Sequence, residues 1–152
     1  MHLTRLKGVL VGLLVTMAAT VLQAENTASP EDVLRAYLGA VTRGDYADAY
    51  DFISEAMRGG KGKDVWVKET EAFMSFADVK IFEFTVQPGK IEGGRAQVPN
   101  LLESQDRFVN ALGLAEYELY TLVKEAGAWK VDSQLLLEPA EVGKWFPDAE
   151  KP

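Results

Sequence analysis

Residues 116–137 read EYELYTLVKEAGAWKVDSQLLL, and this stretch decides the fold. Apolar and polar side chains alternate along 117–124 and again along 129–137, which predicts two strands with one buried face. Between them lies Glu-Ala-Gly-Ala, where Gly127 can take the positive φ that a short hairpin loop needs. A buried helix is the competing interpretation, but Gly127 inside it would cost about 1 kcal/mol. We therefore expect a hairpin onto which the earlier elements fold.

Three helices are predicted upstream of the hairpin. The first begins at Ser29, a suitable N-cap, with Pro30 at the first helical position. Its apolar stripe consists of Val33, Leu34, Tyr37, Leu38 and Val41. Asp45 is expected to cap a second helix through residue 57, and Asp64 to begin a third. The glycine- and lysine-rich run 59–63 between them lacks the flanking strand and spacing of a phosphate-binding loop, so we interpret it as a plain loop.

After Ala77 the apolar period changes from helical to alternating. Residues 79–86 are apolar on both faces, as in a strand that is covered on both sides or lines a cavity. Gly93-Gly94 predicts a turn into a further strand, 95–103, while 104–113 fits either a short helical turn or an inserted loop. A short helix is expected over 139–146. The layout is α+β, with three N-terminal helices on one face of a mostly antiparallel four-stranded sheet.

The first 24 residues have the layout of a secretory signal. Arg5 and Lys7 precede an apolar run, and Gln23-Ala24 comes before an abrupt change to polar sequence. An uncleaved anchor is the alternative, although the apolar run is shorter than the roughly 20 residues that span a bilayer. We therefore predict a signal peptide at 1–24, a linker at 25–28, a domain at 29–152, and a periplasmic or secreted protein without stable membrane insertion after cleavage.

Composition excludes several kinds of site. The chain has no cysteine, and its one histidine, His2, falls in the predicted signal, so the mature domain could not build a His/Cys zinc site, a cysteine nucleophile or a Ser-His-Asp triad. The net charge of −7 would become −9, because the signal holds two of the 16 basic and none of the 23 acidic residues. This acidity disfavours nucleic acid as a partner. We expect no metal and no cofactor.

Two sequence motifs resemble the nuclear transport factor 2-like superfamily, the cystatin-like cone that ketosteroid isomerase also uses. The step Gly44-Asp45 is followed by Tyr-Ala-Asp-Ala-Tyr at 46–50, which is similar to the start of the second helix in that superfamily. Gly127, followed by Trp129-Lys130-Val131, resembles its closing hairpin. The resemblance covers most of residues 29–137 and is nearest to small exported bacterial domains of unknown function. It implies a curved sheet wrapped around a helix-lined apolar pocket.

The resemblance leaves function open, because members include enzymes, small-ligand binders and interaction modules. Aromatic residues that could line the pocket, or equally be plain core, are Tyr37, Tyr50, Trp66, Phe82, Phe84 and Tyr117. Glu83 and Asp132 are candidate acids that sequence cannot place. We expect a noncatalytic exported binding domain for a small apolar ligand or a protein partner, with a homodimer left open. The alternative is an isomerase- or dehydratase-type enzyme with Asp, Glu or Tyr as acid-base groups; a buried carboxylate beside a tyrosine hydroxyl would favour it.

Overall fold

The computed structural model describes residues 28–149. The predicted signal peptide and most of the predicted linker lie outside these residues. The elements, in chain order, are α1 (Pro30–Thr42), α2 (Tyr46–Asp51), α3 (Glu55–Arg58), α4 (Lys63–Phe76), β1 (Lys80–Val86), β2 (Lys90–Glu92), β3 (Arg95–Gln105), β4 (Ala115–Glu125), β5 (Ala128–Leu136) and α5 (Pro139–Trp145).

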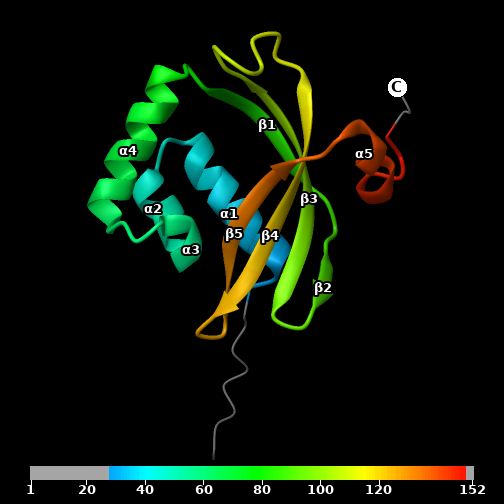
Figure 1. The fold of residues 1–152 in the computed structure, drawn as a ribbon, viewed down its shortest axis with the longest axis horizontal. Helices are drawn as coiled ribbons and strands as arrows, with labels where there is room; N and C mark the ends of the chain where they lie inside the picture. Colours follow the sequence, from blue (N-terminus) through cyan, green and yellow to red (C-terminus); the bar gives the residue numbers. More distant parts are fainter. Residues whose placement is uncertain (1–27, 150–152) are drawn as a thin grey trace, which may run out of the picture.

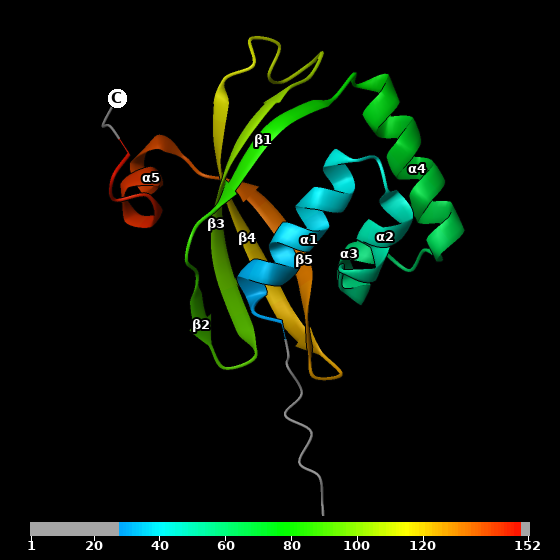
Figure 2. The same cartoon turned by 180° about the vertical axis from the view of Figure 1, so that it is seen from behind.

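One curved antiparallel sheet separates two groups of helices. Its strand order is β1-β3-β4-β5, and the short β2 pairs with β3. Figures 1 and 2 show α1 to α4 on one side of this sheet and α5 on the other. The α+β class with N-terminal helices on an antiparallel sheet is therefore confirmed. The predicted count of four strands is wrong by one, because Gly93-Gly94 joins β3 to the unpredicted β2.

Helix α1 forms the centre of the main core. The Ser29 hydroxyl accepts the Asp32 N–H at 3.1 Å, which caps the helix as predicted. The buried stripe of α1 packs on side chains from β3, β4 and β5. The fully buried members of this core, none more than 9% exposed, are Val33, Leu34, Tyr37, Leu38, Ala40, Ala49, Ile53, Ala96, Val98, Tyr120, Leu122, Trp129 and Val131.

The second predicted helix is broken, which corrects the expected count of three. Helix α2 ends at Asp51 and α3 starts at Glu55. Between them Ile53 forms a parallel bridge with Val131 of β5, and both backbone groups of Val131 bond to residues 52 and 54 at 2.8 Å. Ser54 then caps α3. Burial of Ile53 against the sheet therefore interrupts a stripe that reads as continuous in sequence.

The hairpin predicted over residues 116–137 is present as β4 and β5. Ala126 and Gly127 form its two-residue turn with φ of 49° and 80°, the positive pair that a type I′ turn requires. The register shifts between Thr121 and Leu122, so that Asp132 has no partner. This bulge reverses the side-chain alternation of β5. Gln134 and Leu136 consequently share the helix-side face with Trp129 and Val131.

A second, smaller core lies on the opposite face of the sheet. Trp145 and Phe146 of the α5 segment are each 8% exposed and pack on Leu119 of β4. Tyr117 meets Phe146 edge-on with ring centroids 4.9 Å apart. Strand β4 is thus covered on both faces, and α5 confirms the helix predicted over 139–146.

Candidate functional site

A cleft of about 280 Å³ opens between α1, α4 and the helix-side face of the sheet. It is the interior of the cone. Its walls come from every layer on that side, and its lining residues are Tyr37, Leu38, Val41, Trp66, Thr70, Phe73, Met74, Val79, Ile81, Leu102, Ser104, Asp106, Glu116, Glu118, Tyr120, Gln134 and Leu136. Helix α4 packs chiefly on α2 and has no fully buried residue, which leaves its apolar face turned to this opening.

A buried carboxyl group lies at the floor of the cleft. Glu118 of β4 is 0% exposed, so it lies just beneath the surface that water reaches. Asn100 Nδ2 donates to one Glu118 oxygen at 2.8 Å, and Gln134 Nε2 donates to the other. The Tyr120 hydroxyl also donates to this carboxyl. Every partner is an uncharged donor, so the network satisfies the carboxyl without neutralising its charge.

Burial dominates the electrostatics of this floor. Loss of hydration raises the pKa of Glu118 above its usual 4.5, although the hydrogen bonds from Asn100, Gln134 and Tyr120 oppose that rise. Burial and the nearby Glu118 raise the pKa of Tyr37 to about 12 and that of Tyr120 well above 10. Both phenols therefore stay protonated and act as hydrogen-bond donors at neutral pH.

The cleft is lined by acids and by no bases. Besides Glu118 it contains Glu116, which accepts a hydrogen bond from Ser104 at 3.0 Å, and Asp106. Backbone N–H groups of 108–110 bond to Asp106, and those of Val109 and Phe108 do most to lower the pKa of its carboxyl. Within residues 28–149 no lysine or arginine lies within 4.0 Å of either glutamate's carboxyl.

The aromatic residues proposed from sequence divide between the cleft and other places. Tyr37 and Trp66 line it. Phe84 is half-buried and packs on the main core without reaching the cleft. Tyr50 meets Trp66 edge-on at 5.7 Å, but its hydroxyl donates to the Lys61 carbonyl at 2.8 Å.

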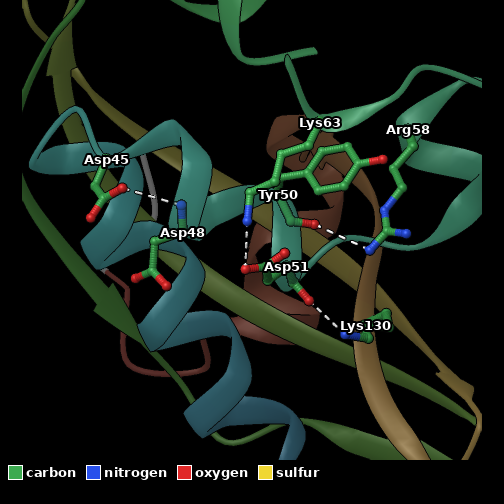
Figure 3. A network of polar contacts seen from close by, with 7 residues as sticks. All are labelled: Asp45, Asp48, Tyr50, Asp51, Arg58, Lys63 and Lys130. Carbon is green, nitrogen blue, oxygen red and sulfur yellow. Dashed lines mark hydrogen bonds and ion pairs between the residues drawn. The ribbon is translucent and has the colours of Figure 1, made fainter. Parts of the chain in front are cut away.

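Tyr50 belongs to a separate polar network on the outside of α2. Figure 3 shows Arg58 and Lys63 beside Tyr50, with Asp51 between Lys63 and Lys130. The Arg58 guanidinium lies 4.3 Å from the Tyr50 ring centre, and Lys63 Nζ donates to the Asp51 carboxylate at 2.8 Å. These exposed contacts join α2 to α3, α4 and β5, and they serve the packing of the helices.

Two of the proposed residues lie on the wrong side of the sheet for a pocket in the cone. A bulge between Ile81 and Glu83 turns Phe82 outward, where it is 61% exposed. Tyr117 packs against Phe146 in the second core. The grouping of Phe82 and Tyr117 with the helix-side aromatics is therefore corrected. The candidate acids are also elsewhere: Glu83 is exposed, and Asp132 accepts from the Ser54 hydroxyl at 2.7 Å.

The mouth of the cleft is apolar. Residues 104–113 were expected to form a short helical turn or a loop. Residues 104 and 105 instead end β3, and 106–114 form a loop beside the end of α4 (Figure 1). The Arg107 N–H bonds to the Ala77 carbonyl at 2.8 Å, and the rings of Phe76 and Phe108 lie 5.3 Å apart. Large exposed side chains gather on these two segments: Phe73, Phe76, Phe108, Val109, Leu112 and Leu114.

A second cleft is larger but chemically plainer. It measures about 400 Å³ and lies between the ends of β4 and β5 and the start of α5. Its walls are mainly apolar, from Tyr117, Leu137 and Val142, and its charged lining residue, Glu116, also lines the cone. A binding site is expected to combine apolar walls with converging polar groups. We therefore assign the candidate site to the cone, where buried hydrogen-bonding groups do converge.

The sequence prediction missed the polar floor. Glu118, Tyr120 and Gln134 alternate with the apolar side chains that were taken as the buried face of the hairpin. Their helix-side position follows from burial on both faces of β4 and from the bulge at Asp132. The spacing Glu-x-Glu-x-Tyr at 116–120 was the available signal, since it puts three polar groups on one strand face.

Two kinds of feature are absent from the described residues. Over residues 28–149, no three His, Cys, Asp or Glu side chains come together in a group that could hold a metal ion. None of the helices in that part of the chain has the length and apolar character needed to cross a membrane.

Comparisons with solved structures fit this architecture. The chain is similar to a SEC-C motif containing protein from Rhodopseudomonas palustris, with a TM-score of 0.55 and 19% identity over 72% of this chain and 80% of that one. It also matches a domain of unknown function with a cystatin-like fold from Nostoc punctiforme, with a TM-score of 0.50 and 13% identity over 68% and 71%. The fold is cystatin-like. No protein-family model matches the sequence, and no curated protein does.

Another similar structure is an NTF2-like protein of unknown function from Cytophaga hutchinsonii. It shares 12% identity over 78% of this chain and 97% of that one, with a TM-score of 0.45, and at that level it carries no argument. The match to the Nostoc punctiforme domain confirms the cystatin-like fold expected from sequence. At such identities these matches show the fold alone, so function has to be argued from the cleft itself.

Proposed function

We propose that this protein is an exported, noncatalytic binding domain whose cone takes a small molecule with an apolar body and a hydrogen-bonding head. The observation that carries this proposal is the combination of apolar walls and a buried polar floor in one cleft. Val41, Met74 and Ile81 suit an apolar body, whereas Tyr120, Glu116 and Gln134 offer hydrogen bonds to a head group. Export rests on the signal layout of residues 1–24.

An acid-base enzyme is the second candidate, and one specific observation favours it. Glu118 is a buried carboxyl hydrogen-bonded to the hydroxyl of Tyr120, the pairing that enzymes use to shift the pKa of an acid or base. However, Asn100 and Gln134 already donate to both Glu118 oxygens, and the residue is 0% exposed. A general base has to reach the proton it removes. While Gln134 covers Glu118, the carboxyl has no free oxygen to accept a proton, so this geometry favours binding over catalysis.

A cleft-filling variant tests the binding proposal. Thr70 of α4 lines the cleft, so Thr70→Trp should fill it. Lys68 is exposed on the same helix and does not line the cleft, so Lys68→Trp is the matched control. Ligand-observed NMR with a panel of small amphiphilic molecules should show binding to wild type and to Lys68→Trp and loss of binding in Thr70→Trp.

The same experiment separates the two candidates. A bound molecule that remains chemically unchanged over hours supports a binding domain. Conversion of the molecule by wild type, abolished by Glu118→Gln, would favour the enzyme. Binding that Thr70→Trp leaves intact would place the ligand outside the cone, and no binding across the panel would contradict the proposal.

A further inference from the structure

We propose that the molecule taken by the cone is a small hydrophobic amine, whose ammonium group replaces the Gln134 amide as the donor to Glu118. This inference rests on the proposed function and names its ligand class. It follows from the charge, the donor count and the aromatic walls of the cleft.

Charge is the first ground. Three carboxyl groups line the cleft, on Asp106, Glu116 and Glu118, and no lysine, arginine or histidine does. Glu116 and Glu118 lie two residues apart on one face of β4, so their charges act on the same volume. Like charges in a site of low dielectric repel strongly, so an anionic ligand is disfavoured and a cation is attracted.

The count of hydrogen-bonding groups is the second ground. The lone pairs on the Glu116 and Glu118 carboxyl oxygens outnumber the side-chain donors that reach them. A neutral carbonyl or ether ligand would add another acceptor. An ammonium group offers three donors and no acceptor, which matches the surplus.

Aromatic walls are the third ground. Tyr37, Trp66, Phe73 and Tyr120 all line the cleft, and the Tyr37 and Tyr120 rings meet edge-on at 6.5 Å. The faces of such rings attract cations, and indole does so most strongly. A volume of about 280 Å³ limits the ligand to a small amine with a single ring or a short chain.

Gln134 gives the ammonium a route to the buried carboxyl. It belongs to β5, its side chain is exposed, and its amide covers one oxygen of Glu118 from the cleft side. An exposed side chain on a strand can change rotamer at small cost. When Gln134 moves aside, Glu118 becomes the nearest acceptor, and its fixed partner Asn100 keeps the carboxyl in place. Asn100 thus acts as the positioning residue, and Gln134 as a displaceable cover.

Calorimetric titration with three molecules that share a skeleton tests the inference. They are 2-phenylethylamine, 2-phenylethanol and phenylacetate, which differ only in head group and charge. The amine should bind wild type at least about tenfold more tightly than the alcohol, because the ion pair with Glu118 and the cation–π contacts both favour the charged head group. Phenylacetate should bind most weakly.

Variants assign that preference to Glu118. Glu118→Gln should lower the amine-to-alcohol ratio several-fold, while Glu83→Gln, which removes an exposed charge away from the cleft, should leave it unchanged. Gln134→Ala, which leaves both carboxyl groups intact, should preserve or increase the ratio. Should Glu118→Gln fail to fold, a ratio lowered by Gln134→Ala would still overturn the inference.

The outcomes separate this inference from the proposed function. Equal affinity for amine and alcohol in wild type, or a preference that is undiminished in Glu118→Gln, refutes the amine and leaves the binding cone standing. Failure of all three molecules to bind contradicts both.

Discussion

Replacing Glu118 with glutamine should destabilise the protein most at low pH, and the dependence on pH is the informative part. Three donors, on Asn100, Gln134 and Tyr120, now share the two oxygens of this carboxyl. A carboxyl has two oxygens that can accept hydrogen bonds, even when it is protonated. The glutamine amide has one such oxygen, because its NH₂ group only donates. One buried donor therefore loses its acceptor, which costs about 1–3 kcal/mol in free energy of unfolding.

The pKa of Glu118 sets how that cost changes with pH. Burial raises the pKa in the folded state, so the folded protein keeps the proton at pH values where the unfolded chain has released it. The stabilisation is complete below about pH 4.5 and is lost as pH rises through the folded-state pKa. Glutamine has no such titration. The destabilisation caused by Glu118→Gln should therefore shrink as pH rises.

Urea melts of wild type and Glu118→Gln at about pH 4, 6 and 8, extrapolated linearly to water, measure how the destabilisation changes with pH. Glu83→Gln is the matched control, because Glu83 is exposed on β1 and has no buried donors. A destabilisation that stays constant or grows with pH would refute the reasoning. It would mean that the three donors outweigh the loss of hydration and hold the carboxyl ionised in the fold.

Three further predictions concern other parts of the chain. Trp145→Ala should cost about 3 kcal/mol in chemical melts. Trp145→Phe should cost clearly less, because it keeps an aromatic ring in the second core while removing a buried indole N–H that has no partner among residues 28–149; equal costs would contradict this. Gly89→Ala should destabilise by about 1–3 kcal/mol in the same assay, because its Cβ would lie 2.7 Å from the Gln97 carbonyl oxygen, and an unchanged midpoint would show that the backbone yields. The intact mass of protein from the native envelope should begin after Ala24, and a mass that retains residues 1–24 would favour an anchor.

Local rules predicted the parts of the fold that depend on few residues. The cap at Ser29, the turn at Gly127 and the helix ending in Trp145 each require one or two residue types at fixed positions. These features were readable because neighbouring residues alone determine them. The break of the second helix could not be predicted in this way, because it depends on Ile53 pairing with Val131, 78 residues away.

The cone interior was harder to predict because two bulges alter the side-chain alternation. At Ile81–Glu83 the bulge sends Phe82 to solvent, and at Asp132 it brings Gln134 to the helix side. A perfect period of two assigns both residues to the wrong face. Glu118 was missed for another reason. A charged residue in a strand normally indicates solvent, and only the structure shows that neutral donors surround it.

The contact of Ile53 with Val131 also protects the sheet against assembly through its edge. β5 is an outer strand, and unpaired backbone groups on such a strand are a template for aggregation. Because residues 52 and 54 occupy both backbone groups of Val131, and Ser54 is held by Asp132, this half of the edge is closed to a foreign strand. A second copy of the chain would have to displace the segment between α2 and α3 before it could continue the sheet along the whole of β5.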